Sequence, residues 1–410
     1  MLIGAVADDI TGGTDLCLML SRAGLRTIQV IGLPEGGLPE ADAVVIALKS
    51  RTIPADDAVE MSLDAASALL AAGARQMLFK YCSTFDSTDR GNIGPVTEAL
   101  MALTGAQVTV ACPAFPTNQR TVYQGHLFVG DKLLSDSPMK DHPLTPMRDA
   151  NLVRVLGRQT SVPVGLVDSA TIARGTEAVR AAFAVEGKRV FVTDTLSDAD
   201  LLVIGAACKG MPLVTGGSGI ALGLAANFVT GKAETAKRMT APTGRSVVLA
   251  GSCSEATRGQ IAAATAGMPV MMLDVIALAD GSQTAAEVAL WVVAQDGIPL
   301  VYSSADPQEL AKVQGQLGVE QSGALVERTL AETARLLQSQ GFARFLVAGG
   351  ETSGAVVAAL GVKMLEIGPE IDPGVPWTRS VGGPDLALAL KSGNFGTPDF
   401  FLKAWDLLDD

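Results

Sequence analysis

Short apolar segments alternate with helical patterns along most of this 410-residue chain, and this alternation restricts its possible folds most strongly. In the first half, strands are predicted at residues 2–7, 27–31, 43–48, 76–81, 107–112, 164–167, 189–193 and 212–215. Helices are predicted at 15–23, 55–72, 93–103, 148–157, 176–185, 198–208 and 220–228, and a hairpin at 119–137. This order predicts an α/β fold with mainly parallel sheets flanked by helices.

A second series of the same kind follows residues 230–244, a polar stretch that ends in a Pro-Thr-Gly break. Its strands are predicted at 246–250, 270–273, 299–302, 344–348 and 364–367, and its helices at 255–266, 285–295, 323–339 and 354–360. The chain also exceeds the length at which one hydrophobic core stops growing. We therefore expect two domains, 1–229 and 245–410, joined by a linker at 230–244.

The net charge of −12 argues against nucleic acids and anionic membranes as partners, because both bind basic surfaces. Apolar residues make up 48% of the chain and charged residues 18%, which is typical of a soluble α/β enzyme. Five cysteines are scattered without a Cys-x-x-Cys pair, so reduced thiols are expected and a zinc site is not. With no signal peptide or membrane span predicted, a cytoplasmic protein is expected.

The first predicted strand runs directly into an acidic pair, Asp8-Asp9, followed by a Thr-Gly-Gly-Thr turn and a helix from Leu16. Ligands of open α/β sheets bind at the carboxyl ends of the strands, where this pair would lie. The alternative is that Asp9 or Thr11 only caps the helix. A cap needs one polar side chain, and this loop also supplies Asp8 and Thr14, which favours a binding site.

Three other strand-end loops of the first half combine cations with hydroxyl or amide side chains: 49–52, 80–92 and 112–121. Such loops suit a small polyhydroxylated carboxylate, because arginine binds a carboxylate bidentately and the hydroxyls and amides bind its alcohols. Taken singly, each Lys or Arg would be a solvated surface charge. Their recurrence at three successive strand ends favours a site.

Glycine and hydroxyl residues follow predicted strands at 214–224, 248–257 and 346–360, and a glycine-rich stretch lies at 391–396. Glycines let the backbone approach a ligand closely, and helix starts attract anions, so these loops predict a phosphate site. No Walker or dinucleotide-binding spacing is present. Cys253, His126 and His142 are expected to be structural more often than functional.

Several segments closely resemble the four-carbon acid sugar kinase family, and the resemblance covers essentially the whole chain. They are ADDITGGTD, KYCSTFDSTDRGNIGPVTEAL, CPAFPTNQRTVYQGHLFVGD, TGGSGIALGL, GSCSEAT, GGETSGAVVAALGV and SVGGPDLALALKSGNFG. Ile10 and Gly13 differ from the family's usual Phe and Ala without changing a functional group. The resemblance implies a sugar-acid-binding N-terminal domain, an ATP-binding C-terminal domain, and an active site in the cleft between them.

The resemblance further implies phosphoryl transfer from ATP, with Mg²⁺, to the C4 hydroxyl of a four-carbon acid, and it is greatest to members that act on 3-oxo-tetronate. D-threonate and D-erythronate are the alternative substrates, and a non-catalytic sugar-acid-binding protein is a more distant alternative. A homo-oligomer is compatible with the sequence.

Site residues follow from strand-end placement and from the resemblance. Asp8 and Asp9 are the predicted catalytic base and Mg²⁺ ligand, with Asp9 preferred as base because it adjoins the turn, and the metal ligands are not assigned further. The predicted substrate-binding residues are Thr11, Arg51, Lys80, Ser83, Arg90 and Asn92, of which Arg51, Lys80 and Arg90 would hold the carboxylate and carbonyl. The predicted ATP-binding residues are Ser252, Ser254, Gly350, Glu351, Thr352, Ser353, Lys391, Gly393 and Gly396.

Overall fold

The computed structural model describes residues 1–142, 144–229, 238–303 and 315–409. The chain divides into two compact units, Met1–Glu234 and Thr235–Asp410, each of which is described by itself. Their boundary lies within the segment predicted as a linker, of which residues 230–237 lie outside the described residues. Both units are α/β structures built on mainly parallel strands, as the sequence predicted.

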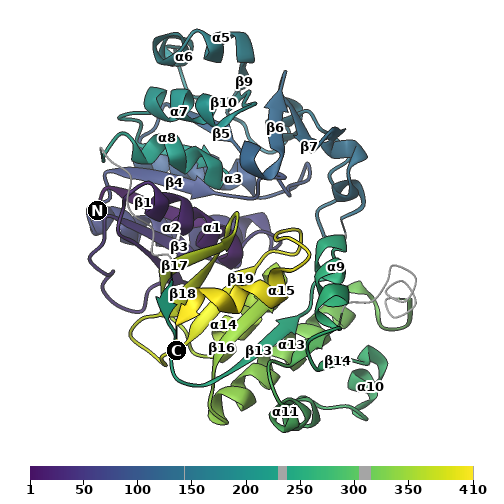
Figure 1. The fold of residues 1–410 in the computed structure, drawn as a ribbon. Helices are drawn as coiled ribbons and strands as arrows, with labels where there is room; N and C mark the ends of the chain where they lie inside the picture. The colour runs from purple at the N-terminus through teal and green to yellow at the C-terminus, as the bar shows by residue number, and fades with distance from the viewer. Residues whose placement is uncertain (143, 230–237, 304–314, 410) are drawn as a thin grey trace. The chain divides into compact units, whose positions relative to one another are not determined.

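The first unit is built on eight parallel strands in the order β2-β3-β1-β4-β11-β5-β10-β9 (Figure 1). The chain starts at β1 in the middle, forms β2 and β3 on one side, and then continues with β4 and later strands on the other. The strands are β1 (Ile3–Ala7), β2 (Thr27–Ile31), β3 (Ala43–Ala47), β4 (Gln76–Lys80), β5 (Val108–Cys112), β9 (Val164–Val167), β10 (Arg189–Thr193) and β11 (Leu213–Gly216). All eight fall within one residue of the predicted strands.

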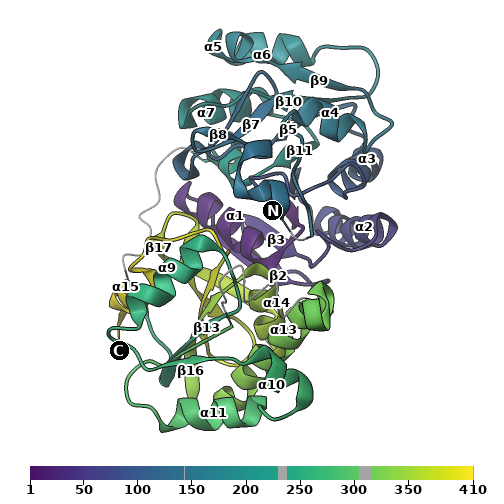
Figure 2. The same ribbon diagram turned by 90° about the vertical axis from the view of Figure 1, so that its right-hand side faces the viewer.

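Helices cover both faces of this sheet. Figure 2 shows α1 and α7 on one face and α2, α3 and α4 on the other. The helices are α1 (Ile10–Arg22), α2 (Ala55–Ala71), α3 (Ile93–Thr104), α4 (Leu152–Gly157), α5 (Ser169–Ala173), α6 (Thr176–Phe183), α7 (Asp198–Ala207) and α8 (Ala221–Ala225). Because helices cover both faces, β1, β3 and β4 are buried along their whole length, which accounts for their apolar sequences.

The prediction of a turn at Thr11–Thr14 and a helix from about Leu16 was wrong. Helix α1 begins at Ile10, so Thr11 to Thr14 form its first turns. Gly13 permits a close approach here, because a Cβ atom would lie 2.8 Å from Ala47 Cβ and 2.9 Å from Gln29 Nε2. The sequence pattern indicates a turn at Gly12 and Gly13, whereas Gly13 serves helix–sheet packing.

The predicted hairpin at 119–137 is present as a three-stranded antiparallel ladder. Its strands are β6 (Arg120–Tyr123), β7 (His126–Val129) and β8 (Lys132–Leu133). Short 3₁₀ helices flank it at Pro116–Asn118, Leu134–Asp136 and Pro138–Asp141, and a further one at Ser218–Ile220 precedes α8. A bridge between Val122 and Thr195 attaches the ladder to the segment that follows β10.

The second unit contains seven strands in the order β14-β15-β13-β16-β19-β18-β17. Five are parallel, whereas β18 is antiparallel to both β17 and β19. The strands are β13 (Arg245–Ala250), β14 (Val270–Met272), β15 (Leu300–Tyr302), β16 (Phe342–Ala348), β17 (Met364–Asp372), β18 (Val375–Ser380) and β19 (Ala387–Lys391). β18 and β19 were not predicted, because Pro376 interrupts β18 and the Gly-Gly-Pro stretch 382–384 separates the two strands.

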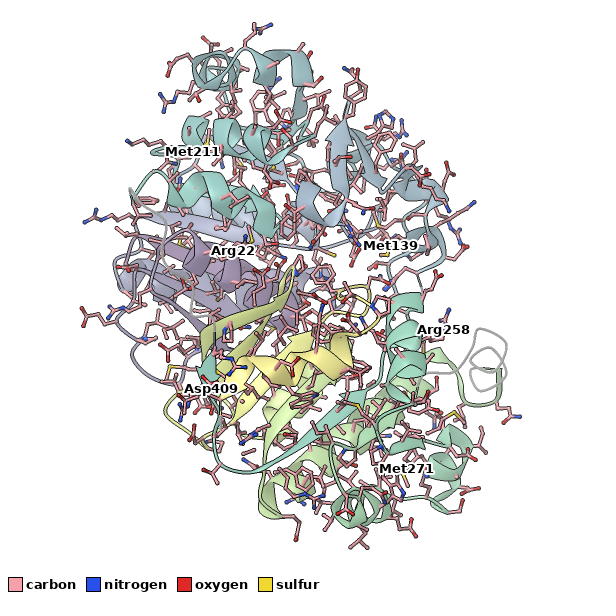
Figure 3. The ribbon with its side chains drawn as sticks, viewed as in Figure 1. Arg22, Met139, Met211, Arg258, Met271 and Asp409 are labelled. Carbon is pink, nitrogen blue, oxygen red and sulfur yellow. The ribbon has the colours of Figure 1, made fainter. Side chains whose placement is uncertain are left out.

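The helices of this unit are α9 (Glu255–Ala264), α10 (Val275–Asp280), α11 (Ala285–Ala294), α13 (Val319–Ser339), α14 (Gly350–Ala359) and α15 (Phe400–Lys403), with a 3₁₀ helix at Ala404–Leu407. Trp377, Phe400 and Phe401 fill a core beside the central strands. A short ladder joins β12 (Met239–Thr240) to β20 (Leu408–Asp409). Beside it, Arg238 Nη1 lies 2.6 Å from the Oδ1 atom of Asp409, which is labelled in Figure 3.

Helix α14 begins four residues before its predicted start at Gly354. Gly349 precedes it with φ of 125°, a conformation that favours glycine, and this allows the helix to start directly after β16. Among the described residues, no helix is long and apolar enough to cross a membrane.

Candidate functional site

The register of the first sheet brings three strand ends to one level. Ala7 at the end of β1 pairs with Ala47 of β3 and with Lys80 of β4. The ladder continues one residue further, because Asp8 N donates to Lys80 O at 3.0 Å and Asp8 O accepts from Ser50 N at 3.0 Å. The strand order reverses at β1, and ligands of open α/β sheets bind at the carboxyl ends of the strands at such a point.

An acidic pair and one arginine form a connected cluster at this point. Arg51 donates to Asp8 through Nε (3.0 Å) and Nη2 (2.7 Å), and its Nη2 also lies 2.5 Å from Asp9 Oδ1. Asp9 caps helix α1 by accepting from Gly12 N at 3.1 Å, and it accepts from Thr11 Oγ1 at 2.7 Å. Asp9 therefore is a cap and is also part of a charged cluster, which the sequence had presented as alternatives.

The two carboxylates differ in their electrostatic environment. Burial raises the pKa of Asp8, and this effect outweighs the opposing effect of Arg51. Burial alone would also raise the pKa of Asp9, but the positive charges of Arg51 and Lys80 lower it below its usual range. The hydrogen bonds from Thr11 and Gly12 act in the same direction. Asp8 is therefore the more basic of the two groups.

Asn92 holds the loop that carries Arg51. Its Nδ2 atom lies 2.8 Å from Ser50 O, 3.2 Å from Arg51 O and 3.0 Å from Ile53 O. The side chain is buried. Its amide donors thus contact three backbone carbonyls, so Asn92 positions Arg51 at the acidic pair.

The other predicted substrate residues have different surroundings. Lys80 is only 2% exposed and donates to Tyr81 O at 2.9 Å. A Cβ atom added to Gly12 would lie 2.9 Å from Lys80 Nζ, so this ammonium reaches the first turn of α1. Ser83 is buried in the loop after β4, whereas Arg90 is exposed on a turn of the same loop.

Two acidic residues of this region were not among the predicted site residues. Asp86 Oδ2 lies 3.8 Å from Arg51 Nη1. Asp15, buried on α1, accepts a short hydrogen bond from Ser218, in the 3₁₀ helix that follows β11. Both lie in segments that the sequence had singled out, but nothing in the local pattern distinguished them from solvent-facing acids.

Three strand ends of the second unit also lie at one level. Ala348 of β16 pairs with Ala250 of β13 and with Lys391 of β19. Their following loops pack closely: a Cβ atom on Gly251 would lie 2.1 Å from Thr352 Oγ1, and one on Gly393 would lie 2.4 Å from Ser252 Oγ. The predicted phosphate loops 248–257, 346–360 and 391–396 are therefore adjacent, and a Cβ atom at either glycine would require the facing hydroxyl group to move.

Lys391 ends β19 at the start of the third of these loops and is completely buried. Its Nζ atom donates to Thr257 Oγ1 (3.0 Å), Ser392 O (3.1 Å) and Gly393 O (2.8 Å). The ammonium group has three N–H donors, so all of them are used. Burial lowers the pKa of Lys391 to about 7, since no carboxylate among the described residues forms an ion pair with it.

Hydroxyl groups complete this network. Ser254 caps α9 by accepting from Thr257 N at 3.2 Å, and its Oγ donates to Gly393 O at 2.6 Å. Gln260 donates to the carbonyls on both sides of Gly396, at 3.0 and 3.1 Å.

Thr352 and Ser353 are buried in the first turn of α14, whereas Gly350 and Glu351 are half-buried. Arg258, labelled in Figure 3, donates a short hydrogen bond from α9 to Cys253 O.

The remaining candidates are structural in their contacts. His126 Nδ1 bonds with Gln124 O at 2.8 Å, and His142 Nδ1 lies 2.9 Å from Thr145 Oγ1. All five cysteines are free thiols. In the described ranges of the chain, no group of three or more His, Cys, Asp or Glu side chains could hold a metal ion.

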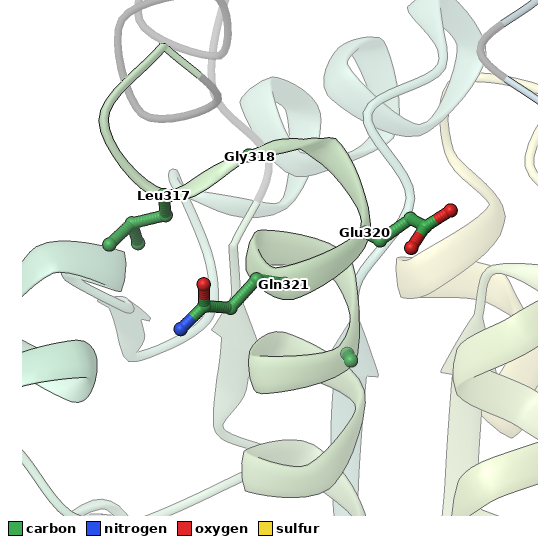
Figure 4. Close-up of a pocket in the computed structure, with 5 residues that line it drawn as sticks. Leu317, Gly318, Glu320 and Gln321 are labelled. Atoms are coloured by element: carbon green, nitrogen blue, oxygen red, sulfur yellow. The ribbon is translucent and has the colours of Figure 1, made fainter.

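A pocket of about 560 Å³ lies at the start of α13 and is lined by Leu317, Gly318, Glu320, Gln321 and Ala324 (Figure 4). It contains none of the predicted site residues. Its lining provides one acid and one amide, and none of its residues is a cation that could pair with a phosphate group.

Comparison with known proteins assigns both halves of the chain. A family model described as a sugar-binding N-terminal domain matches residues 3–224, and one described as a nucleotide-binding C-terminal domain matches residues 247–401. Two similar proteins, from Burkholderia multivorans and Cupriavidus necator, are both named 3-oxo-tetronate kinase. They are 56% and 54% identical to this chain over 100% and 98% of its length, covering 97% and 96% of their own.

Solved structures give the same coverage. A protein of Salmonella typhimurium LT2 that carries the provisional name tRNA synthase matches with a TM-score of 0.86 and 43% identity, over 98% of each chain. A Haemophilus influenzae protein matches with a TM-score of 0.78 and 42% identity, over 98% of this chain and 99% of its own. The fold is therefore shared over nearly the whole length of both structures.

Proposed function

We propose that this chain, which belongs to the four-carbon acid sugar kinase family, transfers the γ-phosphoryl group of ATP to the C4 hydroxyl of 3-oxo-tetronate. The observation that carries the proposal is the 56% identity, over the whole chain, to a relative named 3-oxo-tetronate kinase. The two domain assignments support it, since one half matches a sugar-binding domain and the other a nucleotide-binding domain.

The acidic pair of the first domain is proposed to act on the reacting hydroxyl. Catalysis of phosphoryl transfer rests mainly on positioning and charge neutralisation, with an acid accepting the hydroxyl proton. The raised pKa of Asp8 makes it the better proton acceptor, whereas Asp9 keeps its charge under the influence of Arg51 and Lys80. The sequence favoured Asp9 as the base, because a turn was expected to follow it. The structure has helix α1 there, so the preference changes to Asp8.

Asp9 is then the carboxylate suited to Mg²⁺, because a metal ligand must be ionised. Its side chain is 19% exposed, compared with 8% for Asp8. Mg²⁺ commonly binds one or two carboxylates together with substrate phosphates, so a single available carboxylate fits this ion. When bound, Mg²⁺ neutralises charge on the transferred phosphoryl group.

The adjacent loops of the second domain are proposed to bind the nucleotide phosphates. Helices α9 and α14 both begin in these loops, and free N–H groups at helix starts bind anions. Lys391 has no free donor, so we assign it the role of holding the Gly393 loop against α9. The predicted location of the reaction, between the two domains, stays a prediction.

A coupled ADP-release assay tests this function with 3-oxo-tetronate, D-threonate and D-erythronate, each with ATP and Mg²⁺. We expect turnover with 3-oxo-tetronate to exceed that with the other two acids. Preference for D-threonate or D-erythronate would contradict the substrate but not the kinase. Binding of the acids without ADP release would instead indicate a sugar-acid-binding protein.

The position of transfer is tested on the product. In 3-oxo-tetronate, C4 is a CH₂OH group and C2 is a CHOH group. A proton-coupled phosphorus NMR spectrum should therefore show a triplet for a phosphate on C4, and a doublet would place the phosphate on C2.

A further inference from the structure

We propose that Arg120, together with Asn118, binds the carboxylate of the four-carbon acid, an inference that rests on the proposed function. Both residues lie in the predicted strand-end loop 112–121, but neither was among the named site residues. Arg120 begins β6 directly after the turn that follows β5, and it thus lies on a carboxyl-edge loop of the same sheet as Asp8.

The turn between β5 and β6 is closed by its own backbone. Phe115 N donates to Arg120 O at 2.8 Å, and Arg120 N donates to Phe115 O at 3.1 Å. Inside it, Arg120 Nη1 donates a short hydrogen bond to Asn118 O. One end of the guanidinium group is therefore fixed to the turn, which preorganises its remaining donors.

Two buried donors of this turn have no partner in the described part of the chain. They are Arg120 Nε and Asn118 Nδ2. Buried donors are nearly always hydrogen-bonded, so two such groups two residues apart point to an acceptor that is supplied from outside the chain.

The charge of Arg120 is also not compensated by a contact. Within the described ranges, it forms no ion pair. Asp86 and Asp15 act on it from a distance, but Asp86 lies nearer Arg51 and Asp15 accepts from Ser218. Burial lowers the pKa of Arg120 despite these acids, and an anion would offset that cost.

Of the three cations predicted for this task, Arg51 and Lys80 are occupied by contacts within the chain. Arg51 uses Nε and Nη2 on Asp8 and Asp9, and Lys80 is buried against Tyr81 O. Arg90 is exposed, and a solvated cation adds little to binding. Arg120 is the half-buried cation of this edge that has an unpartnered donor.

Arg120→Met, Arg120→Lys and Asn118→Ala test the proposal, with Arg174→Met as control because Arg174 is an exposed arginine of the same domain. We expect Arg120→Met to raise KM for the acid roughly 10- to 100-fold, as for the loss of a charge-assisted contact, with KM for ATP and the thermal midpoint unchanged. Arg120→Lys should recover part of the loss, and Asn118→Ala should show a smaller increase. Arg174→Met should behave as wild type.

A neutral substrate, the amide of the same acid, separates carboxylate recognition from a structural role. Wild type should prefer the acid over the amide, and Arg120→Met should lose this preference. An acid KM within 3-fold of wild type, an equal rise in KM for ATP, or an unchanged preference would each overturn the proposal. Turnover of any one of the three acids is enough for this test, because each of them carries the carboxylate. A wild-type protein that turns over none of them would contradict the proposed function rather than the role of Arg120.

Discussion

Lys391 should make the stability of the nucleotide-binding domain rise with pH in a range where most lysines have no effect. Its side chain is completely buried and forms no ion pair among the described residues, and burial lowers its pKa from 10.5 to about 7. Below that pH, its ammonium group donates to one hydroxyl and two carbonyls. Replacing it with Met removes the titrating group while keeping an unbranched apolar stem.

The sign follows from the two pKa values. Between pH 7 and 10.5, the unfolded chain holds a proton on Lys391 that the folded chain has lost, so the free energy of unfolding increases with pH. Each pH unit contributes about 1.4 kcal/mol. The difference between wild type and Lys391→Met should therefore change by about 2 kcal/mol between about pH 7.5 and 9.

Urea denaturation without nucleotide measures this difference. The chain has three tryptophans, Trp291, Trp377 and Trp405, and all lie in the second domain, so tryptophan fluorescence reports on that domain. Lys363→Met, at an exposed lysine of the same domain, should leave the pH dependence unchanged. Equal slopes of stability against pH for wild type and Lys391→Met would refute the argument that burial holds this lysine neutral.

Three further predictions concern the two sites. Asp8→Asn should lower kcat by about 10²- to 10⁴-fold and remove the acidic limb of the pH profile. In wild type, that limb should lie above the usual range of Asp, because the pKa of Asp8 is raised. Near-normal turnover of the variant would exclude Asp8 as the base. Asp9→Asn keeps a capping residue and should lower kcat without unfolding α1, as circular dichroism can check. Gly251→Ala should raise KM for ATP and leave KM for the acid unchanged, because the new Cβ atom would lie 2.1 Å from Thr352 Oγ1. Recovery in the Gly251→Ala/Thr352→Ala double variant would identify that contact as the cause. Unaltered ATP affinity in the single variant would contradict the prediction.

Strand positions were predicted well where strands are buried on both faces. β1, β3 and β4 are continuous apolar runs, and such runs depend only on neighbouring residues. β18 and β19 were missed because their stability comes from pairing with each other and with β16, which a local pattern does not contain. The early starts of α1 and α14 were missed for a related reason, since glycines there serve close packing and a backbone of positive φ.

Residue types near the site could be predicted, but their partners could not. Asp8, Asp9 and Arg51 were singled out from strand-end placement, and the structure brings all three together. Lys391 was singled out as a phosphate ligand, yet its donors are used within the chain. Arg120 lies in the predicted loop 112–121 but was not named as a site residue, because only the folded chain shows that one of its donors is unpartnered.

The sequence by itself determined the α/β class, the strand ends that carry polar loops and the family, because periodicity and motifs are properties of adjacent residues. The tertiary structure decided which of those polar groups remain available. Arg51 meets Asp8 across 43 positions, and Lys391 meets Thr257 across 134. Hydrogen-bonding capacity is finite, so a donor used in such a long-range contact cannot also bind substrate, and only the folded chain shows which donors are used.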